Sequence, residues 1–63
     1  MDNREVVINL VSDFFGSDKK AELWMNSENP LLGGVTPEFM IKVGKSDRLL
    51  KFVKTCLDEN RKP

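Results

Sequence analysis

The order of apolar and polar residues along the chain predicts four short helices separated by turn residues. Apolar residues recur every three or four positions, which is the spacing of one helix face, and the strict alternation of a half-buried strand is absent. The predicted helices span about residues 4–15, 18–26, 37–43 and 47–59. We therefore predict an all-α fold, a compact bundle of four short helices that forms a single domain over residues 1–63.

Residues with strong capping preferences mark the ends of these helices. Ser17, Thr36 and Ser46 stand where an N-cap side chain accepts a hydrogen bond from the first turn. Pro37 follows Thr36 at the first helical position, where its missing N–H costs nothing. The first and third predicted helices are each followed by a glycine, the residue that most readily takes left-handed backbone: Gly16 and Gly44.

The same spacing gives each helix an inner face, and these faces predict the core. Its expected members are Val7, Leu10, Val11, Phe14, Ala21, Trp24, Met25, Phe39, Met40, Val43, Leu49, Leu50, Val53, Cys56 and Leu57. Four apolar residues miss these faces: Ile8, Phe15, Ile41 and Phe52. Because a contiguous exposed apolar patch marks an interface, we predict that at least two of the four are exposed and contact a partner; a second core layer is the alternative. Residues 60–63 are expected to fray.

The residue types present favour a binding module over an enzyme. The chain has no histidine and no tyrosine. Cys56, the only cysteine, lies on a predicted inner face, where a free thiol acts as a small core residue. The adjacent carboxylates Asp58 and Glu59 diverge by about 100° around a helix and cannot easily hold one metal ion. We therefore predict no catalytic residue, no metal site and no cofactor.

The charge balance argues against nucleic acids and membranes as partners. Ten Lys and Arg residues offset ten Asp and Glu residues, whereas binding to nucleic acids or anionic lipids rests on a positive surplus. Residues 1–5 are polar, and the apolar run of residues 6–11 is interrupted by Asn9, so neither a signal peptide nor a membrane span is predicted. The single unpaired thiol fits a reducing compartment, and we expect a cytoplasmic protein.

The connection between the second and third predicted helices cannot itself be helical. Pro30 biases Asn29 away from helical backbone, and the adjacent Gly33 and Gly34 can take positive φ. We interpret Asn29-Pro30 and Leu32-Gly33-Gly34 as a rigid turn that sets the angle between the two helices. Direct contact of these residues with a partner is the alternative.

Around this connection the chain resembles the toxin-binding domain of the Xre, MbcA and ParS bacterial antitoxins. Members of that family have an Ala and then a Trp on one helix, an Asn-Pro loop, Leu-Gly-Gly, and Thr-Pro at the start of the next helix. The chain departs from the family at Val35, where many members have a basic residue, and after Leu57, where members commonly end on an aromatic-Gly element. It has the rest of the ordered set: Ala21, Trp24, Asn29, Pro30, Leu32, Gly33, Gly34, Thr36, Pro37 and Gly44.

The resemblance implies a component of a bacterial toxin–antitoxin system. Such a domain binds a RES-type toxin, an enzyme that consumes NAD, and blocks its active site. The C-terminal end of the antitoxin lies close to the toxin's catalytic pocket in such complexes, so by position Arg61 and Lys62 are candidate occluding side chains. Longer members also have a preceding helix-turn-helix domain. The 20 residues before Ala21 are too few for one, so no DNA-binding domain is expected.

Two other functions stay open as alternatives. A helical oligomerisation or adaptor module without toxin-neutralising activity would form a homodimer through the first helix. A small DNA-binding protein is disfavoured by the neutral charge balance. It is also disfavoured by the long connection over residues 29–35, because helix-turn-helix motifs use a turn of about three to four residues.

Overall fold

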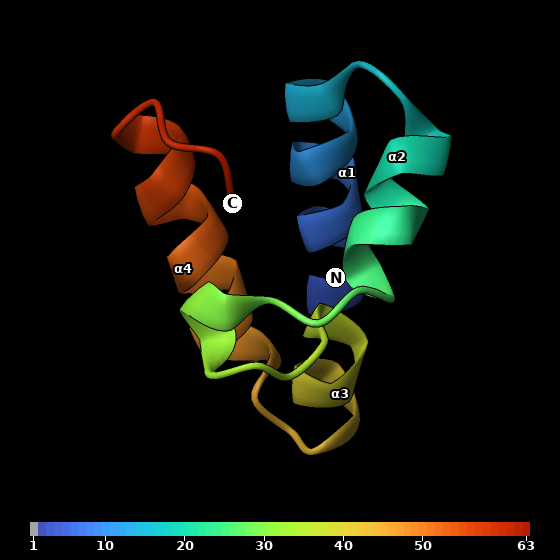
Figure 1. Cartoon of the computed structure of the whole chain (residues 1–63), viewed down its shortest axis with the longest axis vertical. Helices are drawn as coiled ribbons and strands as arrows, with labels where there is room; N and C mark the ends of the chain where they lie inside the picture. Colours follow the sequence, from blue (N-terminus) through green and yellow to red (C-terminus); the bar gives the residue numbers. More distant parts are fainter. Residues whose placement is uncertain (1) are drawn as a thin grey trace.

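The computed structural model describes residues 2–63 and confirms the all-α prediction (Figure 1). Within this range the chain forms no strand, only a single antiparallel bridge between Asn29 and Val35. Its elements are α1 (Asn3–Phe15), α2 (Asp18–Met25), the short 3-10 helix η1 (Pro30–Leu32), α3 (Pro37–Lys42) and α4 (Ser46–Asp58).

Helix α1 is the centre of the arrangement, because it packs against both α2 and α4. Figure 1 shows α1 between these two helices, with α3 across one end of the group. Helix α3 contacts α4 and α2. The segment through η1 crosses the same end of the molecule, from the last turn of α2 toward α4, and then returns to α3. The Asn29–Val35 segment, which connects α2 to α3, therefore also lies near α4.

Two of the three predicted N-caps are confirmed. The Ser17 hydroxyl accepts a hydrogen bond from the Lys20 N–H at 3.2 Å, and the Thr36 hydroxyl accepts one from the Phe39 N–H at 3.0 Å. Each bond satisfies one backbone donor of the first turn that has no partner within the helix. These caps fix where α2 and α3 begin.

The predicted N-cap at Ser46 is wrong. The N-cap residue of α4 is Lys45, which makes no side-chain cap hydrogen bond, and Ser46 is already helical. Helix α4 begins one residue earlier than predicted because the turn after α3 is short. In this turn Gly44 takes a φ of 81° and the Lys45 N–H donates to the Met40 carbonyl at 2.8 Å. The Ser46 hydroxyl instead accepts a hydrogen bond from the Asn3 side chain at 3.3 Å, which ties α4 to the start of α1.

The core lies where α1, α2 and α4 meet. The inner faces predicted for these three helices are confirmed except at Phe14, which is 42% exposed, so its predicted place in the core is wrong. Trp24 packs against the core while half-buried. Removal of this apolar surface from water is the main force that stabilises the fold. The fully or nearly fully buried apolar side chains are Val7, Val11, Ala21, Met25, Met40, Leu49, Val53 and Cys56.

Helix α3 presents a different face to the core from the one predicted. Phe39 and Val43, which the spacing places inside, are 48% and 47% exposed. The helix has six residues, fewer than two turns, so its apolar spacing does not define one face. Contacts with α4 and α2 decide its orientation, and the residues that turn inward are Pro37, Met40 and Ile41.

The last residues do not fray, and that expectation is wrong. Asn60 takes a left-handed φ of 56°, and the Arg61 N–H donates to the Cys56 carbonyl at 2.7 Å. Together these features form a Schellman-type helix end, in which asparagine replaces the usual glycine. The turn directs the C-terminal tail (residues 60–63) back toward the body of the protein, and Pro63 is buried there.

Candidate partner-binding surface

Asn29 organises the connection between α2 and α3 through its backbone and its side chain. Its N–H donates to the Val35 carbonyl at 2.9 Å, and its carbonyl accepts from the N–H groups of Leu32 and Gly34 at 2.9 and 3.0 Å. Its side-chain Oδ1 accepts from the Leu31 N–H at 2.9 Å and so caps η1. One residue, 8% exposed, thereby holds the loop in a closed form.

The two glycines of the loop have backbone angles that other residues rarely adopt. Gly33 and Gly34 have φ values of 81° and 86°. Gly33 follows η1 and donates its N–H to the Pro30 carbonyl at 3.2 Å. A residue with a Cβ in this region costs about 1–2 kcal/mol, which explains why the loop uses glycine at both positions.

The C-terminal tail lies beside this loop, which the sequence pattern did not indicate. The Asn29 Nδ2 donates to the Pro63 carbonyl oxygen at 2.9 Å in a buried hydrogen bond. Between the loop and the tail is a hollow of about 370 Å³, which we call the tail hollow. Its lining residues are Trp24, Ser27, Glu28, Asn29, Pro30, Leu31, Lys62 and Pro63.

Trp24 packs as a core anchor but leaves one polar group unsatisfied. Its indole Nε1 is buried and has no hydrogen-bond partner among the described residues. Buried tryptophan N–H groups usually find an acceptor, and an unmade hydrogen bond of this kind costs about 1–3 kcal/mol. Trp24 therefore stabilises the fold through its apolar surface alone.

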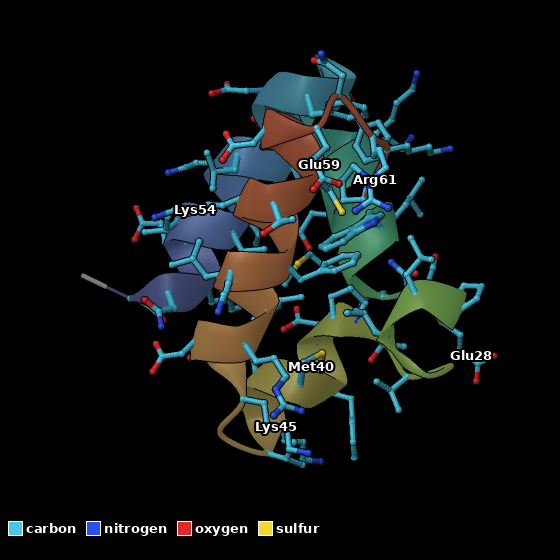
Figure 2. The ribbon with its side chains drawn as sticks, turned by 90° about the vertical axis from the view of Figure 1, so that its left-hand side faces the viewer. Glu28, Met40, Lys45, Lys54, Glu59 and Arg61 are labelled. Atoms are coloured by element: carbon cyan, nitrogen blue, oxygen red, sulfur yellow. The ribbon has the colours of Figure 1, made fainter. Side chains whose placement is uncertain are left out.

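The two tail cations predicted to contact a partner are exposed. Arg61 forms an ion pair with Glu59 at 2.6 Å, with side chains 61% and 55% exposed. Figure 2 shows this pair near the C-terminal end of α4, far from Lys45 at the other end. The Lys62 Nζ lies 5.8 Å from the centre of the Phe15 ring. Exposed contacts of this kind are weak, so both side chains can be redirected at little cost.

A second concave surface, which we call the apolar groove, lies between η1, α3 and α4. It has a volume of about 360 Å³. Of the residues predicted to belong to the binding site, only Leu32 and Phe52 line it. The full lining consists of Leu31, Leu32, Val35, Phe39, Met40, Val43, Lys45, Arg48 and Phe52.

An ion pair between α1 and α3 helps to position the groove. The Arg4 guanidinium donates from Nε and Nη2 to the two carboxylate oxygens of Glu38, at 3.0 and 2.6 Å. This hydrogen bonding lowers the pKa of Glu38 and raises that of Arg4. Glu38 precedes the exposed Phe39, so the pair fixes the helix that presents Phe39 to the groove.

The four apolar residues proposed as partner contacts are less exposed than expected. Ile8, Phe15, Ile41 and Phe52 are all half-buried against the core, so the expectation that at least two are exposed is wrong. On α1 the reason is that two helices, α2 and α4, pack against it. Residues that lie about 100° around α1 from the predicted inner face therefore face a neighbouring helix instead of water. The large apolar side chains that are exposed are Phe14, Leu23, Leu31, Phe39 and Val43.

The described residues form no metal cluster and no membrane-spanning helix. Residues 2–63 contain no group of three His, Cys, Asp or Glu side chains that is able to hold a metal ion. Cys56 is a free, buried thiol within the core. Over the same residues, no helix combines the length and the apolar character that a bilayer span requires. The apolar groove and the tail hollow share Leu31 as a lining residue.

Comparison with known families agrees with this description. Residues 10–56 match the family described as the antitoxin Xre/MbcA/ParS C-terminal toxin-binding domain. The matched segment includes the motif from Ala21 to Gly44 and all residues that line the apolar groove. The chain therefore belongs to this family of antitoxin toxin-binding domains. No curated protein and no solved structure matches the chain.

Proposed function

We propose that this chain is a non-catalytic antitoxin that binds a RES-type, NAD-consuming toxin and blocks its active site. Membership of a toxin-binding family supports the binding of a toxin. The RES class of the toxin and the blocked active site are the specific content of the proposal. The RES class follows from the family resemblance of the motif. The observation that supports a role of the tail in blocking the active site is the hydrogen bond from Asn29 to Pro63, which holds the tail beside the family's Asn-Pro loop.

The tail is suited to enter a neighbouring site because its charged side chains are held only at the surface. Arg61 has one exposed ion-pair partner, Glu59, and exchanging that partner costs less than about 1 kcal/mol. Pro63, in contrast, is buried against the loop. The backbone of the tail is therefore fixed while Arg61 and Lys62 can reach outward, and a preorganised segment loses little conformational entropy on binding.

Co-expression with a RES-type toxin tests the proposal. We expect the unmodified chain to restore growth and the cellular NAD level. The double variant Arg61→Ala/Lys62→Ala, which keeps Pro63 and its contact with Asn29, should lose most of this protection. The matched control is Lys51→Ala/Lys54→Ala, which removes two exposed cations from the middle of α4.

The two parts of the proposal fail in different ways. Full protection by the Arg61→Ala/Lys62→Ala variant would remove the role of the tail. Absence of protection by the unmodified chain against every RES-type toxin would remove the proposed function. That second outcome would favour the oligomerisation module, which light scattering on the Phe15→Glu variant would then test as loss of a homodimer.

A further inference from the structure

We propose that the apolar groove is the docking site for a segment of the toxin that carries carboxylates next to its apolar side chains. This inference rests on the proposed function. It adds the place on the antitoxin where the toxin docks, separate from the tail, and the chemistry of the segment that docks there.

The first argument is the apolar surface that the groove leaves in water. Leu31, Phe39 and Val43 are 62%, 48% and 47% exposed, and all three line the same hollow. The buried Met40 and the half-buried Phe52 contribute to the same wall. Small soluble proteins rarely leave large apolar side chains together in a concave surface unless a partner covers them. A hollow of about 360 Å³ is large enough to take anchoring side chains of the kind that dominate interface energies.

The second argument is the charge at the edge of the groove. Lys45 and Arg48 line the groove, and no carboxylate does. Neither cation forms an ion pair within residues 2–63, whereas Arg4 and Arg61 are both paired. Figure 2 shows Lys45 at the end of the molecule opposite Glu59 and Arg61. A segment that places carboxylates beside its apolar anchors would satisfy both features, because complementary charge favours association and excludes wrong partners.

The same charges argue against a second copy of this chain as the occupant. A two-fold interface pairs the same patch on both subunits. Groove against groove would bring together two sets of Lys45 and Arg48, with no carboxylate from either lining. Such an arrangement is repulsive, so the charge at the edge favours a partner of different composition.

The groove is connected to the surface used by the tail. Leu31 lines both the apolar groove and the tail hollow, so the two form one continuous surface across η1. The backbone under this surface is held by the hydrogen bonds of Asn29 and by the Arg4–Glu38 ion pair. A toxin seated on the groove would therefore have the tail within the same interface, on a framework formed before binding.

The experiment measures affinity for a RES-type toxin, with both full-length proteins purified separately. Phe39→Ser should raise Kd at least about 30-fold, as expected for loss of a central anchor. Lys45→Glu/Arg48→Glu should raise Kd about 10-fold at low salt and less at high salt. The matched controls are Leu23→Ser, which changes an exposed large apolar residue outside the groove, and Lys51→Glu/Lys54→Glu on α4. Circular dichroism and thermal unfolding confirm that each variant is folded.

A photo-reactive amino acid at position 43 then identifies the docked segment. In the complex it should cross-link to a toxin peptide that combines large apolar residues with Asp or Glu. Wild-type affinity of both groove variants, or a cross-linked peptide rich in Lys and Arg, would overturn the groove inference and leave the proposed function standing. A free chain that is dimeric until Phe39→Ser separates it would overturn the inference in favour of a second copy. Failure of the unmodified chain to bind removes the proposed function and this inference together.

Discussion

The body formed by α1, α2 and α4 differs from the region of residues 29–45 in what it does with its apolar residues. In the body, most side chains on the inner faces are buried or half-buried, and several, including Val7, Met25 and Leu49, are fully inaccessible to water; Phe14 and Leu23 are its exposed large apolar residues. In residues 29–45, three large apolar side chains, Leu31, Phe39 and Val43, stay about half exposed or more. The first region uses its apolar surface for folding, and the second leaves much of it exposed to water.

The physical origin of this difference is the length and the neighbours of each helix. Helices α1 and α4 have 13 residues each and pack along one another, so each has a well-defined buried stripe. Helix α3 has six residues and lies across the end of the body. A chain of this size has an unfolding free energy of only about 3–9 kcal/mol. Because the fully buried apolar side chains lie mainly in the body, the body supplies most of this free energy. Substitutions in the two regions should therefore have different consequences, as four predictions describe.

The largest expected effect is that of a cavity in the body. Leu49→Ala removes a fully buried side chain and should lower the free energy of unfolding by about 2–5 kcal/mol, enough to unfold much of the protein. Phe39→Ala, a truncation of similar or larger size at a half-exposed site, should change it by less than about 1 kcal/mol. Urea denaturation followed by circular dichroism measures both. Equal losses would contradict the division of the molecule into a body that supplies the stability and a region whose exposed apolar residues contribute little to it.

The next largest effect should come from Asn29. Its hydrogen bond to Pro63 joins the region of residues 29–45 to the tail that follows α4. Asn29→Ala removes the acceptor for the Leu31 N–H and the donor to Pro63, and should cost about 1–3 kcal/mol. Asn29→Asp keeps the acceptor but cannot donate in its ionised form, so it should release the tail while η1 stays capped. Amide hydrogen exchange at Arg61, whose N–H donates to the Cys56 carbonyl, measures the release. Unchanged exchange in both variants would show that the tail does not depend on this hydrogen bond.

A smaller effect is expected at Gly33, whose positive φ ends η1. Gly33→Ala should lower the free energy of unfolding by about 1–2 kcal/mol, because the Cβ meets no neighbouring atom and the cost is only that of the backbone conformation. Gly33→Asn should recover part of this loss, since asparagine tolerates left-handed backbone. Thermal unfolding of the three proteins gives the comparison, and a Gly33→Ala variant as stable as the wild type would contradict the assigned strain.

The smallest effect should come from the Arg4–Glu38 ion pair, because both side chains are about one-third exposed. Glu38→Gln should cost about 0.5 kcal/mol near neutral pH, with Glu28→Gln as the control at an exposed carboxylate without an ion pair. Arg4 lowers the pKa of Glu38 in the folded protein below its ordinary value. The stabilisation is therefore complete above the ordinary carboxyl range and is lost as the pH falls through the lowered pKa. Unfolding measured at neutral and acidic pH should show the difference between the two variants disappear in acid.

The body was predictable from the sequence because its helices are long enough for periodicity to select a face. Ser17 and Thr36 were equally predictable, since N-caps depend on neighbouring residues only. The face of α3 was not predictable, because contacts with distant helices orient so short a segment. One residue in the sequence could have indicated the return of the tail. Asn60 stands just after the last apolar residues of α4, where asparagine can take the left-handed backbone that ends a helix.

The candidate site was predictable only in part. The ordered motif from Ala21 to Gly44 indicated the family and the position of the loop. It did not indicate the apolar groove, because the groove depends on Phe39 and Val43 facing outward, and the spacing of α3 predicts the opposite. Lys45 and Arg48 carry no signal in the sequence, since only the fold shows that they border an apolar hollow without a carboxylate.

The burial of Pro63 beside Asn29 has a practical consequence for every binding measurement on this protein. A polypeptide joined after Pro63 would leave the molecule next to the Asn29–Val35 loop, and not from the outer end of α4. A purification handle or a reporter fused at this end would therefore lie beside the tail hollow and obstruct any partner that docks there. Fusions of this kind would mimic a loss of recognition in a protein whose fold is intact.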